Sequence, residues 1–81
     1  MMKYRTFPTY SLDLHGTRHQ DVFTKVDRFI GEHLLKGTPA ITIITGHSPE
    51  MKKRVQSVLD QYEMYGQQGV INSGQLTVDL T

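Results

Sequence analysis

The sequence predicts an α/β domain: a two-layer sandwich in the order β-α-β-α-β-β, with a mixed four-stranded sheet and two helices. Apolar residues alternate in the segments expected to be strands, and they recur every three to four residues in the segments expected to be helices. The chain has 81 residues, which is enough for one core only. We therefore expect a single domain over residues 10–81, preceded by an arm, residues 1–9, without sustained periodicity.

The two segments expected to be neighbouring strands differ in composition. The first, residues 10–14, alternates so that Tyr10, Leu12 and Leu14 face the core. The second, Ala40–Ile44, is β-branched and apolar almost throughout, as is typical of a central strand with neighbours on both sides. We expect the second strand to lie parallel to the first.

The first helix is expected between these strands, over about residues 17–36. Thr17 followed by Gln20 fits a capping box, Gly37 fits a left-handed C-cap, and Pro39 prevents continuation. Its apolar positions recur at helical spacing. They are Val22, Val26, Phe29, Ile30 and Leu34.

The second helix is expected to begin after Ser48, which is a suitable N-cap, with Pro49 at the first helical position. Gly66 is the expected stop. The apolar positions again lie on one stripe. They are Met51, Val55, Val58, Leu59 and Tyr62.

The remaining residues predict a hairpin of two short strands. The first covers about residues 69–71, the turn covers residues 72–74, and the second covers residues 75–80. In the last strand Leu76, Val78 and Leu80 face the core, whereas Thr77 and Asp79 face away from it. Right-handed crossovers place both helices on one face of the sheet and leave Asp13, His15, Thr77 and Asp79 on the open face.

Composition excludes several classes of function. The absence of cysteine excludes a disulfide scaffold, a thiolate nucleophile and any thiolate metal site. No apolar run has the length of a signal peptide or a membrane helix, so we expect a cytoplasmic chain without a membrane partner. Nine Lys and Arg against eight Asp and Glu give a net charge of +1, so a nucleic-acid surface would have to come from local clustering.

An acid and an imidazole lie two residues apart where the first strand ends, at Asp13 and His15. Strand alternation puts both side chains on one face. An imidazole transfers protons near neutral pH, and a neighbouring carboxylate can orient it or favour its charged form. The alternative is that Asp13 bonds the backbone of the turn and that His15 caps the next helix.

A second candidate segment follows the central strand, where Thr45, Gly46 and His47 lead into Ser48 at the expected helix start. Amide groups and the dipole at a helix N-terminus attract phosphate, and the basic run 52–54 one turn later would add to that attraction. The alternative is that Ser48 is only a cap, His47 faces solvent, and the basic run is a solvated helix face.

Three motifs occur in one order: Leu-Asp-Leu-His-Gly at 12–16, Ile-Thr-Gly followed by His-Ser at 44–48, and Asn-Ser-Gly-Gln-Leu-Thr-Val-Asp-Leu at 72–80. Over roughly residues 10–80 the chain resembles the Smr domain, the small MutS-related nuclease module. The resemblance implies a fold like the C-terminal domain of bacterial translation initiation factor three. It also implies an endonuclease, because family members nick branched DNA or cut messenger RNA on stalled ribosomes.

By position, the resemblance implies that Asp13 and His15 are the active-site acid and histidine, and that Gly46 lies in a loop contacting substrate. The family's second motif usually reads Thr-Gly-x-Gly with further residues before His-Ser. Here Thr45-Gly46 runs directly into His47, so the loop is shorter and the second glycine is absent. A shorter loop changes the contact with substrate.

Together these arguments give a set of candidate site residues. The catalytic candidates are Asp13, His15 and His47. The substrate-binding candidates are Gly16, Arg18, Thr45, Gly46, Ser48, Lys52, Lys53 and Arg54. The histidines form no metal set, since His15 and His19 share the i, i+4 spacing only across a turn. RNA cleavage through the 2′-hydroxyl requires no cofactor, whereas Asp13 would be the ligand if Mg²⁺ takes part.

Other residues are given structural roles. His19 and His33 are expected at the surface, Met51 and Met64 in the core, and Tyr62 on the buried stripe. Three functions stay open: an endonuclease acting on RNA or branched DNA, a non-catalytic nucleic-acid-binding module, and a protein–protein interaction domain, which the near-neutral charge favours. A recruiting protein or a homodimer would supply affinity that so small a module lacks.

Overall fold

The computed structural model describes residues 10–69 and 73–80, and these form the predicted order β-α-β-α-β-β. The strands and helices are bounded as follows: β1 Tyr10–Asp13, α1 His19–Lys36, β2 Ala40–Ile44, α2 Pro49–Gln61, β3 Gln67–Gln68 and β4 Gln75–Asp79. Within the described ranges no helix is both long and apolar enough to cross a membrane.

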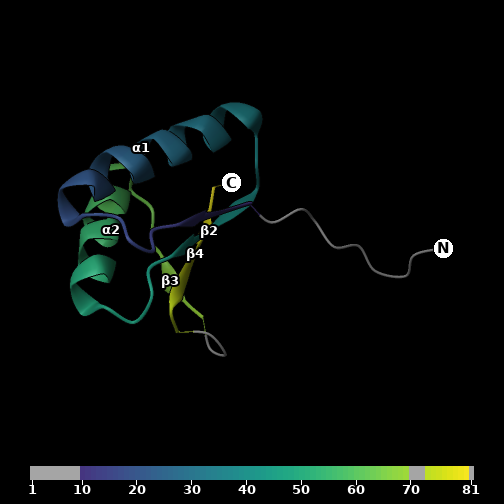
Figure 1. The fold of residues 1–81 in the computed structure, drawn as a ribbon. Coiled ribbons are helices and arrows are strands. Elements are labelled where there is room, and N and C mark those ends of the chain that lie inside the picture. Colours follow the sequence, from purple (N-terminus) through teal and green to yellow (C-terminus); the bar gives the residue numbers. More distant parts are fainter. Residues whose placement is uncertain (1–9, 70–72, 81) are drawn as a thin grey trace.

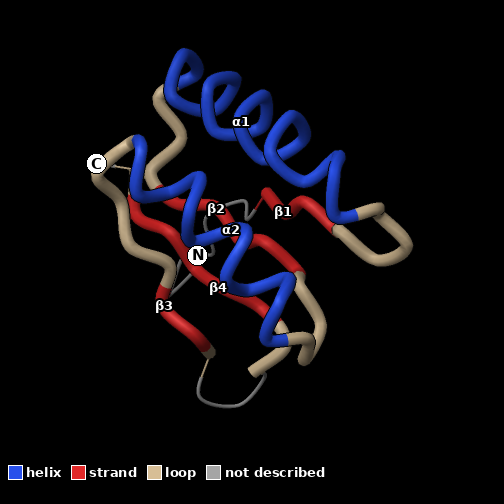
Figure 2. Tube along the Cα trace, turned by 90° about the vertical axis from the view of Figure 1, so that its left-hand side faces the viewer, coloured by secondary structure: helices blue, strands red, loops and turns tan. Residues whose placement is uncertain are grey.

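The four strands form one mixed sheet in the order β1-β2-β4-β3. β1 is parallel to β2 and β4 runs antiparallel to β3, as predicted. β4 also runs antiparallel to β2. Both helices pack on one face of this sheet (Figures 1 and 2), so the molecule is a two-layer sandwich. The predicted fold class is confirmed.

The core lies between the helices and one row of strand residues. Ile41 and Ile43 of β2 are completely buried, and their partners on β4, Val78 and Leu76, point to the same face. Leu12, paired with Ile43 from the β1 side, packs against the same cluster. The opposite face is open, because Asp13, Thr77 and Asp79 are exposed on it.

α1 begins one residue later than the predicted cap at Thr17 implies. Its N-cap is Arg18, which makes no side-chain capping hydrogen bond, so the capping box of Thr17 and Gln20 does not form. The Thr17 hydroxyl instead accepts a hydrogen bond from Lys25 Nζ at 3.2 Å. The other end is as predicted: Gly37 has φ +75° and its N–H donates to the carbonyls of His33 and Leu34.

The buried stripe of α1 contains His33, which the sequence had placed at the surface. His33 is 4% exposed, whereas Leu34, predicted to face the core, is 39% exposed. Three helical turns are about 10.8 residues, so position 33 lies under Val22 and position 34 is rotated away. The imidazole Nδ1 is hydrogen-bonded to Thr38 Oγ1 at 2.8 Å, and the ring packs against Tyr10, whose own side chain is 43% exposed.

α2 starts as predicted and stops earlier. Ser48 Oγ accepts the N–H of Met51 at 3.1 Å, which confirms Ser48 as the N-cap. The helix ends at Gln61, and Glu63 follows with φ +59°, so Gly66 is not the stop. Gly66 is buried between α2 and β4, and a Cβ there would lie 2.9 Å from Leu59 Cδ1 and 3.3 Å from Leu76 Cβ.

The hairpin differs in its first strand, which is Gln67–Gln68 and lies before the predicted residues 69–71. Residues 70 and 71 of that prediction, and Asn72 of the predicted turn, lie outside the described residues. The last strand agrees with the prediction, with Leu76 and Val78 buried and Leu80 packed against the core. Met51 is also buried and Met64 packs against the core, as expected.

The two helices are joined by a hydrogen bond that the sequence did not suggest. Tyr62 Oη donates to Asp27 Oδ1 at 2.5 Å, and Tyr62 also packs against the core. This hydrogen bond, together with burial and the negative charge of Asp27, raises the pKa of Tyr62 above 10.0. The contact therefore stabilises the fold only while the phenol keeps its proton.

Gly66 and Gly31 form a matched pair for testing the packing. Gly66→Ala is expected to lower the free energy of unfolding by about 1–3 kcal/mol, because the added methyl group overpacks the space beside Leu59 and Leu76. Gly31→Ala, in the middle of α1 with nothing within 4 Å of the added Cβ, is expected to raise it by about 0.5–1 kcal/mol. Urea unfolding measures both, and equal shifts would contradict the packing of Gly66.

Tyr62→Phe tests the contact between the helices. At pH 7 the variant is expected to be less stable by about 1 kcal/mol, the usual net contribution of one hydrogen bond. Because the folded-state pKa of Tyr62 is raised, its contribution is complete below about pH 9 and is lost as the pH rises above about 10. Thermal unfolding of both proteins across this range is the measurement, and a difference that stays constant would contradict the assignment.

Candidate functional site

The turn after β1 is built around Asp13 and His15. The backbone N–H of His15 donates to Asp13 Oδ1 at 2.9 Å, and Thr17 N donates to the Leu14 carbonyl at 2.9 Å. Leu14 is 1% exposed and anchors the turn, while Gly16 allows it to close with φ +75°. The side chains of Asp13 and His15 are both exposed. The carboxylate thus bonds the turn backbone, whereas His15 does not cap α1.

Backbone hydrogen bonds bring three distant segments to one edge of the sheet. Leu14 N donates to the Ile44 carbonyl at 3.0 Å, which holds the first turn against the end of β2. The N–H groups of Thr45 and Gly46 both donate to the Gly74 carbonyl, at 2.9 and 2.8 Å. The carboxyl ends of β1 and β2 therefore meet the start of β4 at this edge, on the left in Figure 1.

Thr45 and Gly46 hold the loop after β2 in place through hydrogen bonds. Thr45 is buried, and its hydroxyl donates to the carbonyls of Gly46 at 2.8 Å and Gly74 at 3.3 Å. Gly46 is exposed with φ +70°, a conformation that favours glycine. Thr45 therefore fixes the loop from inside, and the N–H and the carbonyl of Gly46 are both hydrogen-bonded within it.

His47 and Ser48 connect this loop to α2. His47 is exposed. Ser48 Oγ accepts the N–H of Met51, so this hydroxyl oxygen caps α2. The loop that leads into the amino end of α2 thus leaves the sheet at the same edge as the turn that carries Asp13 and His15.

The basic run of α2 does not form one patch, because Arg54 lies apart from Lys52 and Lys53. Lys52 Nζ donates to Gln68 Oε1 at 2.9 Å on the β3 side. Arg54 forms an ion pair with Glu50 at 2.9 Å, and it lines a hollow beside the start of α1. Lys53 is exposed, and within the described ranges its ammonium group has no partner. Successive helix residues are rotated by 100°, so three in a row must diverge.

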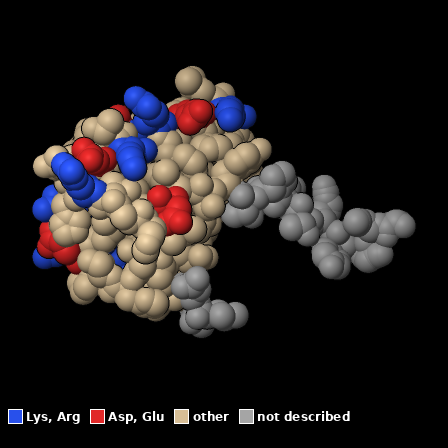
Figure 3. Space-filling model, in the orientation of Figure 1, with Lys and Arg blue, Asp and Glu red and all other residues tan. Residues whose placement is uncertain are grey.

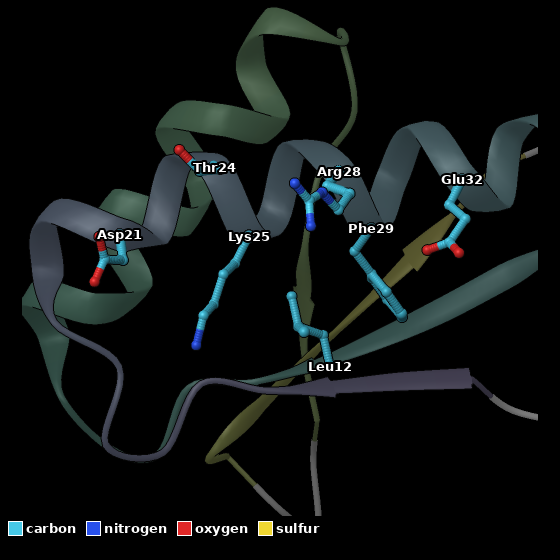
Figure 4. A pocket seen from close by; sticks show the side chains of 7 residues that line it. All are labelled: Leu12, Asp21, Thr24, Lys25, Arg28, Phe29 and Glu32. Atoms are coloured by element: carbon cyan, nitrogen blue, oxygen red, sulfur yellow. The ribbon is translucent and has the colours of Figure 1, made fainter.

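A cation that the sequence analysis missed lies near the first turn. Lys25, two turns into α1, extends from the helix toward the loop that follows β1 (Figure 4), and its Nζ donates to Thr17 Oγ1. Arg18, which was predicted, is exposed at the N-cap. Only the packing of α1 over β1 brings Lys25 here, since eight positions separate it from Thr17.

Lys25 also lines a hollow of about 510 Å³ between α1 and β1. Leu12 and Phe29 form its apolar wall, and Asp21 and Glu32 add acidic groups to it. Figure 3 shows the same mixture of both signs over α1. Among residues 10–69 and 73–80 no three His, Asp or Glu side chains gather closely enough to hold a metal ion.

Comparison with known proteins links these motifs to a family. The chain is 50% identical over 36 residues to the endonuclease MutS2 of Lactiplantibacillus plantarum, which is 44% of this chain and 5% of that protein. It is 49% identical over 35 residues to the endonuclease MutS2 of Listeria welshimeri, which is 43% of this chain and 4% of that protein. The chain therefore spans only a small part of the length of these relatives.

No solved structure matches the chain. The sequence model of the Smr domain, in contrast, matches residues 12–79, from Leu12 in β1 to Asp79 at the end of β4. This range contains both helices, the last three strands, the second half of β1 and the edge at which the three motifs meet. The chain belongs to the Smr domain family.

Proposed function

We propose that the protein is an endonuclease that cleaves phosphodiester bonds in RNA or nicks branched DNA. The observation that carries this proposal is that the Asp13–His15 turn is held at the end of β2, from which the chain continues through residues 45–48 into α2. A proton-transferring side chain and a helix amino end therefore belong to the same edge of the sheet. Relatives named endonucleases support the same reading.

On RNA, the chemistry needs a base and an acid. His15 accepts the proton of the 2′-hydroxyl, whose oxygen then forms a bond to phosphorus while the bond from phosphorus to the 5′-oxygen breaks. A protonated His47 donates its proton to the departing 5′-oxygen. Asp13 holds the backbone of His15 through Oδ1, so it acts first as a positioning residue.

On DNA there is no 2′-hydroxyl, and water must be the nucleophile. Asp13 Oδ2 is the oxygen left for a Mg²⁺ ion, which would activate water and complete its shell with substrate phosphate oxygens. Mg²⁺ is therefore an optional partner in this proposal.

The phosphate is held by backbone and cations. The first turn of α2 offers the N–H of Glu50, because Pro49 has none and Met51 N donates to Ser48 Oγ. Lys53 offers an ammonium group without a competing partner among the described residues. Arg54 acts indirectly, because its ion pair neutralises Glu50, which would otherwise repel an anion at this helix end. Arg18 and Lys25 approach from α1 and supply positive charge beside Gly16.

A non-catalytic nucleic-acid-binding module is the second candidate. The hydrogen bond from His15 N to Asp13 Oδ1 favours it, because this bond explains the carboxylate without any chemistry. In either case we propose a cytoplasmic module delivered to its substrate by a partner protein or by dimerisation, which raises the effective concentration. The matched segment is only 4–5% of the length of the two MutS2 relatives, so there it is one part of a long chain.

His15→Ala and Asp13→Asn test the catalytic reading. Cleavage of labelled single-stranded RNA and branched DNA is expected to fall by roughly 10²–10⁴-fold in His15→Ala, the usual contribution of a general acid or base. Asp13→Asn retains an oxygen that accepts the His15 N–H, so it removes the charge while it keeps the turn. A loss of DNA cleavage alone in EDTA would assign Mg²⁺ to the water-dependent reaction.

The control is His19→Ala, which removes an exposed histidine four positions along the chain and is expected to leave cleavage unchanged. Folding of every variant is checked by its unfolding curve. If the wild type binds the substrates without cleaving them, the endonuclease proposal is wrong and the non-catalytic binding module is supported. If it neither binds nor cleaves them, both proposals are wrong.

The salt dependence of binding tests how the phosphates are held. With two or three phosphate contacts, the slope of log K against log salt for single strands is expected to be about −1.4 to −2.1. Lys53→Ala is expected to reduce this slope by about 0.7 for every sequence tested, whereas Lys36→Ala, at the far end of α1, leaves it unchanged. A slope independent of Lys53 would remove that residue from the site.

A further inference from the structure

A hollow of about 470 Å³ lies where α2 passes over β3, outside the edge described above. It begins at Pro49, the first residue of α2, and includes Lys52, Lys53, Tyr65 and Gln68. Its lining contains two cations and no acidic residue, whereas the hollow over β1 contains Asp and Glu. The charge of this hollow therefore suits an anion.

Tyr65 is the unusual feature of this hollow. The side chain is 74% exposed, although it lies in a short connection whose neighbours are packed. Burial of apolar surface does not explain an aromatic ring at this position.

The backbone on both sides of Tyr65 is fixed by one side chain. Gln56 of α2 donates through Nε2 to the Met64 carbonyl at 3.2 Å and accepts the Gly66 N–H through Oε1 at 3.1 Å. Met64 N also donates to the Leu59 carbonyl at 2.9 Å, and Gly66 is buried against Leu59 and Leu76. The exposed ring thus stands on a rigid support, which lowers the entropy cost of binding through it.

The cations beside the ring are arranged for a phosphate. Lys52 is held toward β3 by its hydrogen bond to Gln68, and Lys53 is exposed without a partner in the described part of the chain. An aromatic face next to ammonium groups is how proteins bind single-stranded nucleic acid, with a base on the ring and the backbone on the cations.

The hollow reaches Pro49, at the end of the loop that leaves the proposed catalytic edge. β3 lies three strand positions from β1, a distance of about 14 Å at ~4.8 Å for each neighbour. Gln67 is level with Ser11 through the pairing of the strands, so Tyr65 also lies toward the opposite end of the strands from His15. A single strand that reaches from His15 to Tyr65 would therefore place several nucleotides on the protein.

We propose that this hollow is a nucleotide subsite in which a base stacks on Tyr65 and its phosphate lies on Lys53. The inference rests on the proposed function and limits its substrates to nucleic acids with a single-stranded segment. A base inside a duplex is stacked on both sides, so the ring selects substrates with a single-stranded segment. The net charge of the chain is only +1. In this proposal, stacking on Tyr65 supplies the part of the affinity for nucleic acid that charge does not supply.

The test compares Tyr65→Ala, Tyr65→Phe and the control Leu35→Ala, which removes a side chain that is 91% exposed on α1. Fluorescence anisotropy measures the affinity of the 81-residue protein for labelled single-stranded RNA, single-stranded DNA and the corresponding duplexes. Tyr65→Ala is expected to weaken single-strand binding roughly 5- to 150-fold. Tyr65→Phe and Leu35→Ala are expected to bind like the wild type, and duplex binding is expected to be unaffected by Tyr65→Ala.

A spectroscopic variant separates stacking from a structural effect. The chain has no tryptophan, so Tyr65→Trp introduces one fluorophore, whose emission is expected to be quenched when a single strand binds. Unchanged emission on binding, or an affinity of Tyr65→Ala equal to that of the wild type, would overturn the subsite while the endonuclease proposal stands. Failure of the wild type to bind any of these nucleic acids would overturn the proposed function itself, and the subsite with it.

Discussion

The pairing of β2 on both of its sides is the constraint on which the rest of the structure depends. β2 is parallel to β1 and antiparallel to β4, so it fixes the direction and register of both. Its residues Ile41 and Ile43 are completely buried beneath the two helices. Loss of this strand would remove the row of side chains against which α1 and α2 pack, and it would separate the segments that form the candidate site.

The same pairing explains why the functional candidates lie at one edge. β1 and β2 are parallel, so the chain leaves both strands in the same direction and must turn back into a helix each time. Gly74, at the start of the antiparallel β4, is thereby brought to this edge, and its carbonyl accepts two N–H groups from the loop after β2. The shared geometry of a sheet edge, rather than direct contact between side chains, unites residues 13–16 with residues 45–48.

Charge plays a smaller part than in most proteins that bind nucleic acids. The net charge is +1, and the cations of α1 are interspersed with acids (Figure 3). Lys53 remains available because its ammonium group has no partner in the described part of the chain, whereas Lys25 shares its hollow with Asp21 and Glu32. Recognition through a helix end, a stacking ring and a few cations fits such a chain better than a broad basic surface.

The sequence by itself determined the order of elements, the parallel pairing of the first two strands, the Ser48 cap and the family motifs. These follow from periodicity and local turn chemistry, which act over a few residues. Local rules failed where two signals competed: Thr17 fits a capping box, yet the buried Leu14 holds the turn so that α1 starts later. They also failed for His33, because polarity suggested the surface although helical geometry placed it under Val22.

Only the tertiary structure decided which cations are available and which aromatic ring is presented to solvent. Lys52 is directed toward Gln68 and Arg54 toward Glu50, so these two cations diverge. The rigid support of Tyr65 comes from Gln56 and from the packing of Gly66. These partners come from other turns and other elements, so no local pattern predicts them. The sequence determines which side chains stand at the end of each strand. The packing of the elements determines which other side chains they contact.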